Sequence, residues 1–546
     1  MLTGAASGFA AVWLVKMLRF LQGLAWPSFP TFLGAVEQSS PLHRVLVCIA
    51  GGAVVTVAAL ISKRPMAGHG TSSIIESIWI RSGRMQLRRT LVRGTVSIIA
   101  VAFGAPLGRE GALLQLGAAV GSTLGRQLRI PADQARLLVA CGASAGIAAA
   151  YNVPIGAALF GLEVLLGSFA LELFGPIVVA CVVATLISRV LISDHPSYDI
   201  PLHSLMQPKE LLLDVAVGPV LGVAAAFYNR TISGFSDWMD RIPRKLFVFM
   251  PILAMAVVGV SSLALPQLLG NGYDTVDQAL LGGLTWKMLL ILPLAKMLLT
   301  AFTSASGIPG GLFTPSLFFG ALLGGAMGHL VQLISPGAAP AGAYALIGMG
   351  AILAATTHAS VSAVLIIFEL TGNYEVILPL MLTTVIAAAV SRRLEPESLY
   401  TAPLRRRNIQ LPQTQRAFLA TADVQSLLTP GADHVSSSTT FQEVVVRLLA
   451  LPAGNDLYVT TPEGLLLGVI VLDALKGHLP DHSLLSMTVA ADVMAPPIQP
   501  LTVQLSLSEV ASRFADTDLE RLPVVDSRGR LIGTLSKRDI LRLGRF

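Results

Sequence analysis

The sequence predicts an all-α polytopic membrane protein that contains an inverted internal repeat and carries an α/β domain at its C-terminus. First, the 546 residues are 53% hydrophobic and only 13% charged, whereas soluble domains have about 25% charged residues. Second, residues 1–400 hold 42 of the 70 charged residues and residues 401–546 hold 28. Third, a glycine-rich pattern recurs within the first 400 residues. A membrane region at 1–400 followed by a water-soluble tail is therefore expected, and a single soluble globule is excluded.

The membrane part has too many long apolar stretches for anything except a polytopic helical protein. The first, residues 3–26, contains Lys16 and Arg19 without a separate charged leader, so a retained helix is expected rather than a signal peptide. Several later stretches are broken by Gly and Pro, which lipid tolerates only where the backbone is buried in protein or lines a watery cavity. These later stretches are 43–62, 91–107, 137–192, 211–235, 246–269, 288–302, 316–334, 343–371 and 376–391.

Basic residues predict the orientation. Segment 63–93 has seven basic residues and one acidic residue, Glu76, and the membrane part ends near Arg392, Arg393 and the run 405–407. By the positive-inside tendency, both regions and the tail are cytoplasmic. The chain is expected to be a multi-pass protein of the plasma or inner membrane, in contact with lipid.

The internal repeat divides the membrane part. Residues 104–121 match residues 307–324 at seven of eighteen positions, and residues 142–164 fall on 348–370 in the same order. Chance matching of abundant glycines explains this less well than a true repeat, because order and spacing are kept. We therefore expect two halves, about 1–195 and 208–400. Such halves place a transport site at their interface, with broken helices directed at an anionic solute.

Two glycine-rich breaks are the expected site. At 108–111 (GREG), the glycines allow a tight turn into a helix whose free N–H groups attract an anion, and the Glu110 carboxylate can occupy that position as a gate. The second break, 310–315, has no acid, so it can hold an anion but cannot block itself. The amides of Leu312 and Phe313 are its expected ligands.

These motifs resemble the CLC family of chloride channels and proton-coupled chloride exchangers. The resemblance rests on GREG at 108–111, GLFTP at 311–315, FELTGNYEVILP at 368–379 and SLYTA at 398–402. It implies that Glu110 is the gate and that Tyr400 closes the central site from the cytoplasmic side. It also implies a homodimer with one pore per subunit. The anion-binding residues expected in total are Gly70, Arg109, Glu110, Gly111, Leu312, Phe313 and Tyr400.

Three departures from the family pattern bear on the function. Aligning the motif GSGIP with residues 69–73 replaces the pore serine by Gly70, and Ala112 stands where proline is usual. The third is Val164, which occupies the place of an inner proton-relay glutamate. Because valine cannot bind a proton, a passive gated channel for chloride and other small anions is favoured, with a proton-coupled antiporter as the alternative. A structural role is favoured for Glu163 and Glu369.

Other classes fit less well. The segment 142–146 matches G-x-S-x-G, with Ser144 and His358 as conceivable partners in an intramembrane hydrolase, but no strand precedes it. A small-residue packing face explains it better. A cation channel needs in-membrane acids, which are sparse. No cofactor, metal or nucleic acid is expected, since the histidines lack ligand spacing and the tail has no basic tract.

The tail contains a second repeat. Residues 427–478 and 493–545 match at an offset of 65 after a linker at 401–426, and strands alternate with amphipathic helices in each copy. Both copies resemble CBS modules, which implies a pair able to bind an adenine nucleotide. Ser536 and Asp539 are the candidate ligands, although a helix cap explains the same two residues and is favoured.

Overall fold

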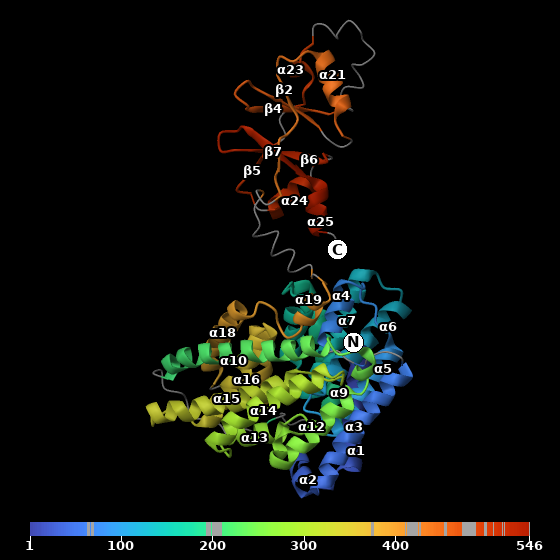
Figure 1. The fold of residues 1–546 in the computed structure, drawn as a ribbon, viewed down its shortest axis with the longest axis vertical. Coiled ribbons are helices and arrows are strands. Elements are labelled where there is room, and N and C mark those ends of the chain that lie inside the picture. The colour runs from blue at the N-terminus through green and yellow to red at the C-terminus, as the bar shows by residue number, and fades with distance from the viewer. Residues whose placement is uncertain are drawn as a thin grey trace. The chain divides into compact units, whose positions relative to one another are not determined.

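The chain forms two compact units, residues 1–409 and 410–546. The computed structural model describes residues 1–62, 66, 70–192, 198, 210–372, 376–409, 411, 424, 427–452, 456–471, 488–495, 499–505, 507–515, 517 and 519–544. In Figure 1 the first unit is a bundle of helices, and the strands lie in the orange and red second unit. The helical unit therefore extends to Ile409, beyond the predicted boundary at 400.

The first half of the helical unit follows the expected apolar stretches but interrupts one of them. The stretch 137–192 breaks where α7 ends at Asn152, which has the left-handed φ of 63°, and again at Gly167. The elements are α1 Leu2–Ala25, α2 Phe32–Gln38, α3 Pro41–Ser62, α4 Thr71–Trp79, α5 Leu87–Ala102, α6 Glu110–Gln127, α7 Ala132–Tyr151, α8 Pro154–Phe160, the π-helix η1 Gly161–Leu166 and α9 Leu171–Leu191.

The second half has the same character. Its elements are α10 Glu210–Met239, α11 Arg244–Phe247, α12 Met250–Ala264, the 3₁₀-helix η2 Pro266–Leu268, α13 Tyr273–Leu280, α14 Trp286–Ala305, α15 Phe313–Ile334, α16 Ala341–Thr357, α17 Ser360–Thr371, α18 Ile377–Leu394 and α19 Ala402–Arg406. Within the described residues, seven helices are long and apolar enough to cross a membrane. The predicted polytopic helical fold is confirmed.

The repeat predicted from sequence is visible in the backbone. Gly104 and Gly307, which are matched in the repeat, both have φ of 99°. Helix α7 ends at Asn152 and α16 ends at His358, each with a left-handed φ. These equivalent special conformations show that the two halves break their helices at the same places.

Helix packing repeats as well. A Cβ added to Gly117 of α6 would lie 2.0 Å from the carbonyl oxygen of Gly142 in α7. The equivalent contact joins Gly320 of α15 and Gly348 of α16, at 2.4 Å. Glycine is needed at these positions because the two backbones approach so closely. The segment 142–146 is therefore a helix-packing face, as the sequence favoured.

The two halves also cap one another's helices. The carboxylate of Glu369 in α17 accepts hydrogen bonds from the N–H groups of Ile155 (3.0 Å) and Gly156 (2.7 Å) in α8. Glu163 in η1 accepts one from the N–H of Ser362 in α17 (2.8 Å) and one from its hydroxyl (2.6 Å). Each acid thus satisfies free N–H groups at a helix start in the opposite half.

The tail contains two small sheets. Their orders are β2-β3-β4 and β1-β7-β6-β5; β2 is parallel to β3 and β5 is parallel to β6, while β3–β4 and β6–β7 are antiparallel. The elements are β1 Thr429–Pro430, β2 His434–Ser436, α21 Phe441–Ala450, β3 Leu457–Thr460, β4 Leu466–Ile470, α23 Ala490–Val493, β5 Leu501–Thr502, α24 Leu507–Ala515, β6 Arg521–Val525, β7 Leu531–Ser536 and α25 Lys537–Gly544. Two copies of one α/β module are present.

Segments at the edges of the predicted copies 427–478 and 493–545 pack in the other module. Strand β1 pairs with β7 of the second module, and Val424 packs in the second module's core. Conversely, Ala490 belongs to the core of the first module. The offset in sequence detects equivalent strands, but it cannot detect that the segments flanking them are exchanged between the modules.

Candidate functional site

Glu110 lies where the two halves meet. It is the first residue of α6, and only 1% of it is exposed. Its Oε1 accepts a hydrogen bond from the N–H of Thr314 (3.1 Å), and its Oε2 accepts one from the Thr314 hydroxyl (2.9 Å). Thr314 belongs to the first turn of α15 in the second half. A negative side chain from one half thus occupies the N-terminus of a broken helix from the other.

The second break has no acid of its own, but an acid from the first half occupies it. Glu110 begins its own helix α6, as the sequence placed it, and its carboxylate in addition accepts hydrogen bonds from Thr314 of α15. Sequence spacing could not reveal this, because the contact joins residues 204 positions apart.

A tyrosine completes the surroundings of the carboxylate. The Tyr151 hydroxyl donates to Glu110 Oε2 at 3.2 Å and lies 2.9 Å from the Thr314 hydroxyl. Neither Tyr151 nor Thr314 was among the residues predicted for the site. Thr314 lies within the predicted break 310–315, which was a usable signal, whereas Tyr151 lies at the end of α7, away from both predicted breaks.

Arg109 is held beside this group by aromatic rings. Its guanidinium carbon is 5.8 Å from the ring centre of Tyr151 and 5.4 Å from that of Tyr273. These are cation–π distances. A further ring, that of Tyr198, lies 5.5 Å from Tyr273. The expected positive charge is therefore present next to Glu110, in an aromatic setting that the sequence did not predict.

Glycines let three backbone segments converge. Gly108 and Gly311 exchange hydrogen bonds in both directions, at 2.9 and 2.8 Å. A Cβ on Gly111 would lie 2.9 Å from the Gly311 nitrogen. Gly70 has φ of 70° and a Cβ there would lie 2.9 Å from the Gly111 carbonyl oxygen. Because only glycine fits well at residue 70, this position serves close packing.

Leu312 and Phe313 lie at the start of α15, as expected. Leu312 is the N-cap and Phe313 the first helical residue, and each is 1% exposed. N–H groups in the first turn of a helix have no intrahelical acceptor, so they are suited to an anion. The Phe313 ring lies between Tyr151 at 5.6 Å and Phe160 at 6.4 Å.

Tyr400 is connected to this site through Phe160. The two rings are 6.0 Å apart, and only 2% of Tyr400 is exposed. Its carbonyl oxygen accepts a hydrogen bond from the Ser72 hydroxyl at 2.8 Å. The rings of Tyr151, Phe313, Phe160 and Tyr400 therefore form a continuous series from the Glu110 carboxylate to the chain end of the helical unit.

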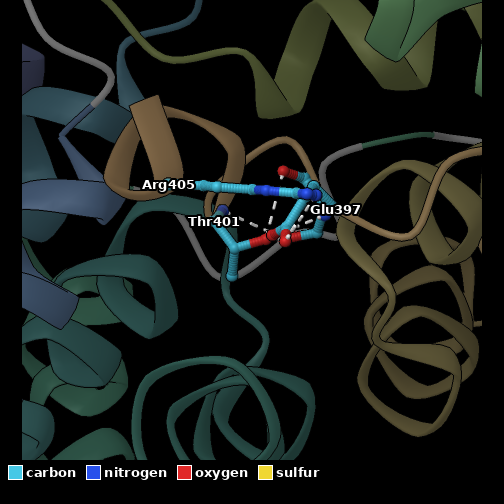
Figure 2. A network of polar contacts seen from close by, with 4 residues as sticks. Glu397, Thr401 and Arg405 are labelled. Carbon is cyan, nitrogen blue, oxygen red and sulfur yellow. Dashed lines mark hydrogen bonds and ion pairs between the residues drawn. The ribbon is translucent and has the colours of Figure 1, made fainter. Parts of the chain in front are cut away.

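A polar turn fixes the backbone around Tyr400. The N–H of Ser398 donates to the Thr401 hydroxyl at 2.9 Å, and Arg405 lies 3.4 Å from the Glu397 carboxylate. Figure 2 shows Glu397, Thr401 and Arg405 gathered in this network. Tyr400 is thereby positioned by short-range contacts as well as by ring packing.

The other candidates from the sequence do not join the site. Ser144 is fully buried on α7, and a Cβ on Gly161 would lie 2.1 Å from its hydroxyl oxygen. No strand precedes it among the described residues, so the hydrolase alternative has no support. Within the same residues, no group of three or more His, Cys, Asp or Glu side chains could hold a metal ion.

In the tail, the Ser536 hydroxyl accepts a hydrogen bond from the N–H of Arg538 at 3.1 Å. Asp539 lies in the first turn of α25. This is the local helix-end bonding that the sequence favoured for Ser536. An adenine nucleotide would have to displace or share this hydrogen bond.

The fold and the site together define a class. Two halves with equivalent broken helices, an anion-attracting helix start and a buried acid between the halves are features of a membrane anion transport protein, not of an enzyme.

Comparison with known proteins gives the family. Residues 51–392 match the voltage-gated chloride channel family, and residues 489–545 match the CBS domain. The chain therefore belongs to the voltage-gated chloride channel, or CLC, family. It is 35% identical to a putative ClcB-like chloride channel protein of Ralstonia nicotianae over 74% of this chain and 95% of that protein.

Two solved structures share the fold. A slow cyanobacterial Cl⁻/H⁺ antiporter has a TM-score of 0.68 and 24% identity, covering 74% of this chain and 96% of its own. A eukaryotic CLC transporter has a TM-score of 0.65 and 18% identity, and the match covers 98% of this chain and 96% of the transporter chain. The predicted family and fold are confirmed.

Proposed function

We propose that the protein is a passive chloride channel whose gate is Glu110. The observation that carries the proposal is the Glu110 carboxylate on the N-terminus of α15, where it accepts the Thr314 N–H. Helix starts attract anions, so a carboxylate at this position competes with a permeating anion. Protonation or movement of Glu110 would free the Thr314 N–H for chloride or another small anion, and the amides of Leu312 and Phe313 would be its further ligands.

Two residues, Val164 and its neighbour Glu163, favour a channel over an antiporter. Valine cannot carry a proton, and the neighbouring Glu163 carboxylate is already engaged by the N–H and hydroxyl of Ser362. A coupled exchanger needs a route for protons past this point. The alternative of a proton-coupled antiporter is kept because a solved structure of the same fold is a Cl⁻/H⁺ antiporter.

Flux in reconstituted liposomes distinguishes the two. We expect a chloride gradient to drive chloride movement without stoichiometric proton movement, and a pH gradient alone to drive no chloride uptake. Stoichiometric proton countertransport would establish the antiporter instead.

The gate assignment is tested by Glu110→Gln and Glu110→Ala. Both variants remove the negative charge, so we expect flux near neutral pH to rise to the level that the unmodified protein reaches in acid and to lose its pH dependence. Glu37→Gln, at an exposed position, is the matched control and should leave the profile unchanged. Retention of the original pH dependence in both Glu110 variants would refute the gate.

The remaining assignments complete the proposal. Arg109 would draw anions towards the gate, Gly111 and Gly70 would maintain the close backbone approach, and Tyr400 would close the site at its other end.

The family motif GSGIP can also be aligned one residue earlier, with residues 68–72. Gly70 then matches the second glycine of the motif, and His69, which lies outside the described residues, takes the serine position. We further propose a homodimer with a cytoplasmic tail; nucleotide binding at Ser536 and Asp539 is the alternative to their helix-end role.

A further inference from the structure

We propose that the hydroxyls of Tyr151 and Thr314 form a latch that holds the Glu110 gate closed and sets the pH at which it opens. The inference rests on the proposed role of Glu110 as gate and adds the two residues that regulate it. Neither residue was singled out by the sequence motifs.

Geometry supplies the first argument. Glu110 Oε2, the Tyr151 hydroxyl and the Thr314 hydroxyl lie within 3.2 Å of one another in all three pairings. The three residues come from α6, α7 and α15, so the latch joins both halves of the repeat. Movement of Glu110 must break the two contacts to its carboxylate.

Burial makes these contacts strong. Tyr151 is 1% exposed and Thr314 is fully buried. Hydrogen bonds to an ionised carboxylate are about twice as strong as neutral ones, and the low dielectric of a buried site strengthens them further. The Tyr151 ring is fixed in turn by the Phe313 ring at 5.6 Å.

The count of protons links the latch to pH. Three contacts join Glu110 Oε2, the Tyr151 hydroxyl oxygen and the Thr314 hydroxyl oxygen. While Glu110 is ionised, only the two hydroxyl groups carry hydrogens that can be donated in these contacts. Both can then point at the carboxylate, which stabilises its charged form. A proton on Glu110 supplies a third hydrogen, so the carboxyl group becomes a donor and no longer needs both hydroxyls. The latch therefore favours the closed, ionised gate, and acid weakens it.

The surrounding groups do not replace this role. Arg109 is the neighbouring cation and interacts electrostatically with Glu110. Among the residues that the structure describes, the other titratable groups that interact with Glu110 are tyrosines, namely Tyr151, Tyr198, Tyr228, Tyr273 and Tyr400. Among the described residues, only Tyr151 of this set has a hydroxyl hydrogen bond to the carboxylate.

The same donors imply a ligand for the open state. When Glu110 leaves, the Thr314 N–H and the two hydroxyls face the vacated position, and buried donors are costly to leave unsatisfied. A halide or another small anion with several acceptor directions satisfies all three. The latch residues therefore also contribute to anion binding once the gate is open.

The test compares the pH dependence of chloride flux in liposomes for Tyr151→Phe, Thr314→Val and the unmodified protein. Each variant removes one hydroxyl and keeps the shape, and Thr314→Val keeps the N–H. We expect the pH of half-maximal flux to rise by about one to two units, the equivalent of one charge-assisted hydrogen bond. Thr314→Ser keeps the hydroxyl, so its pH profile should match that of the unmodified protein.

Tyr228→Phe is the matched control. Tyr228 is fully buried, and its hydroxyl has no hydrogen-bond partner among the described residues. We expect its profile to match that of the unmodified protein. A purely structural role for Tyr151 would lower the yield of folded protein and the total flux without moving the pH midpoint.

The outcomes separate the two proposals. Chloride flux in the unmodified protein with superimposable profiles in Tyr151→Phe and Thr314→Val would refute the latch alone. Absence of chloride flux in the unmodified protein would refute the proposed function and the latch together. A midpoint shift in Tyr228→Phe equal to that in Tyr151→Phe would also refute the latch.

Discussion

At the scale of single residues, the site depends on compensating the burial of one acid. An ionised carboxylate with 1% exposure is costly unless it is hydrogen-bonded. Glu110 was predictable because GREG is a local motif at a helix start. Tyr151 and Thr314 were not, because they lie 41 and 204 positions from Glu110 and only tertiary packing brings them together.

A half-buried acid, Asp456, gives a prediction for the tail. It precedes β3, and its Oδ2 has no hydrogen-bond partner among the described residues. Burial raises its pKa from 3.8 to about 6, with Arg521 opposing the shift and Glu520 adding to it. The native state thus binds a proton that the unfolded state has already lost, so stability falls as pH rises from about 4 to 6.

We therefore expect Asp456→Asn to stabilise the tail above pH 6, by about 1 kcal/mol after allowance for partial exposure, and to have little effect below pH 4. Hydrogen exchange of the β3 amides in the full chain, compared with the unmodified protein at each pH, measures this. Asp526→Asn is the contrast, because N–H groups of Arg530 and Arg528 lower the pKa of Asp526. Equal protection in Asp456→Asn and the unmodified protein at pH 7.5 would contradict the prediction.

At the scale of elements, the sequence predicted where helices break but not how the breaks are stabilised. The repeat located the equivalent glycines and aligned Glu163 with Glu369. It gave no indication that each acid caps a helix in the opposite half, because the partners lie about 200 positions away. The π-helix η1 was also not predicted, since hydrophobic periodicity does not distinguish one π turn inside an apolar stretch.

The exchanged caps predict a stability effect separate from transport. Glu163→Gln and Glu369→Gln remove charges that complement helix N-termini, so we expect each to lower the free energy of unfolding by about 1 kcal/mol. Thermal unfolding in detergent measures the loss, with the exposed Glu37→Gln as control. Chloride flux in both variants should remain free of stoichiometric proton movement, as in the unmodified protein. If the unmodified protein instead moved protons and Glu163→Gln lost this movement at unaltered thermal stability, Glu163 would be a relay.

At the scale of the whole molecule, symmetry made the architecture predictable. Two sequence repeats gave the two halves of the helical unit and the two modules of the tail, because equivalent residues keep their spacing in both copies. Within the tail, β1 pairs with β7 of the second module and Ala490 packs in the core of the first. Linear spacing records which segments are equivalent, whereas pairing between them is decided by packing.

The division into two units predicts that residues 1–409 fold and conduct without the tail. This segment contains Glu110, the start of α15 and the whole turn around Tyr400, and it forms a compact unit of its own. We expect a chain ending at Ile409 to be monodisperse in detergent and to keep its chloride flux and the pH midpoint of that flux. A chain ending at Pro396 is the control: it loses Tyr400 and its hydrogen bond from Ser72, so closure at that end of the site should fail. If the 1–409 chain aggregated or lost its pH dependence, the tail would have to be part of the gate, and the Glu110 latch would not be sufficient to close the pathway.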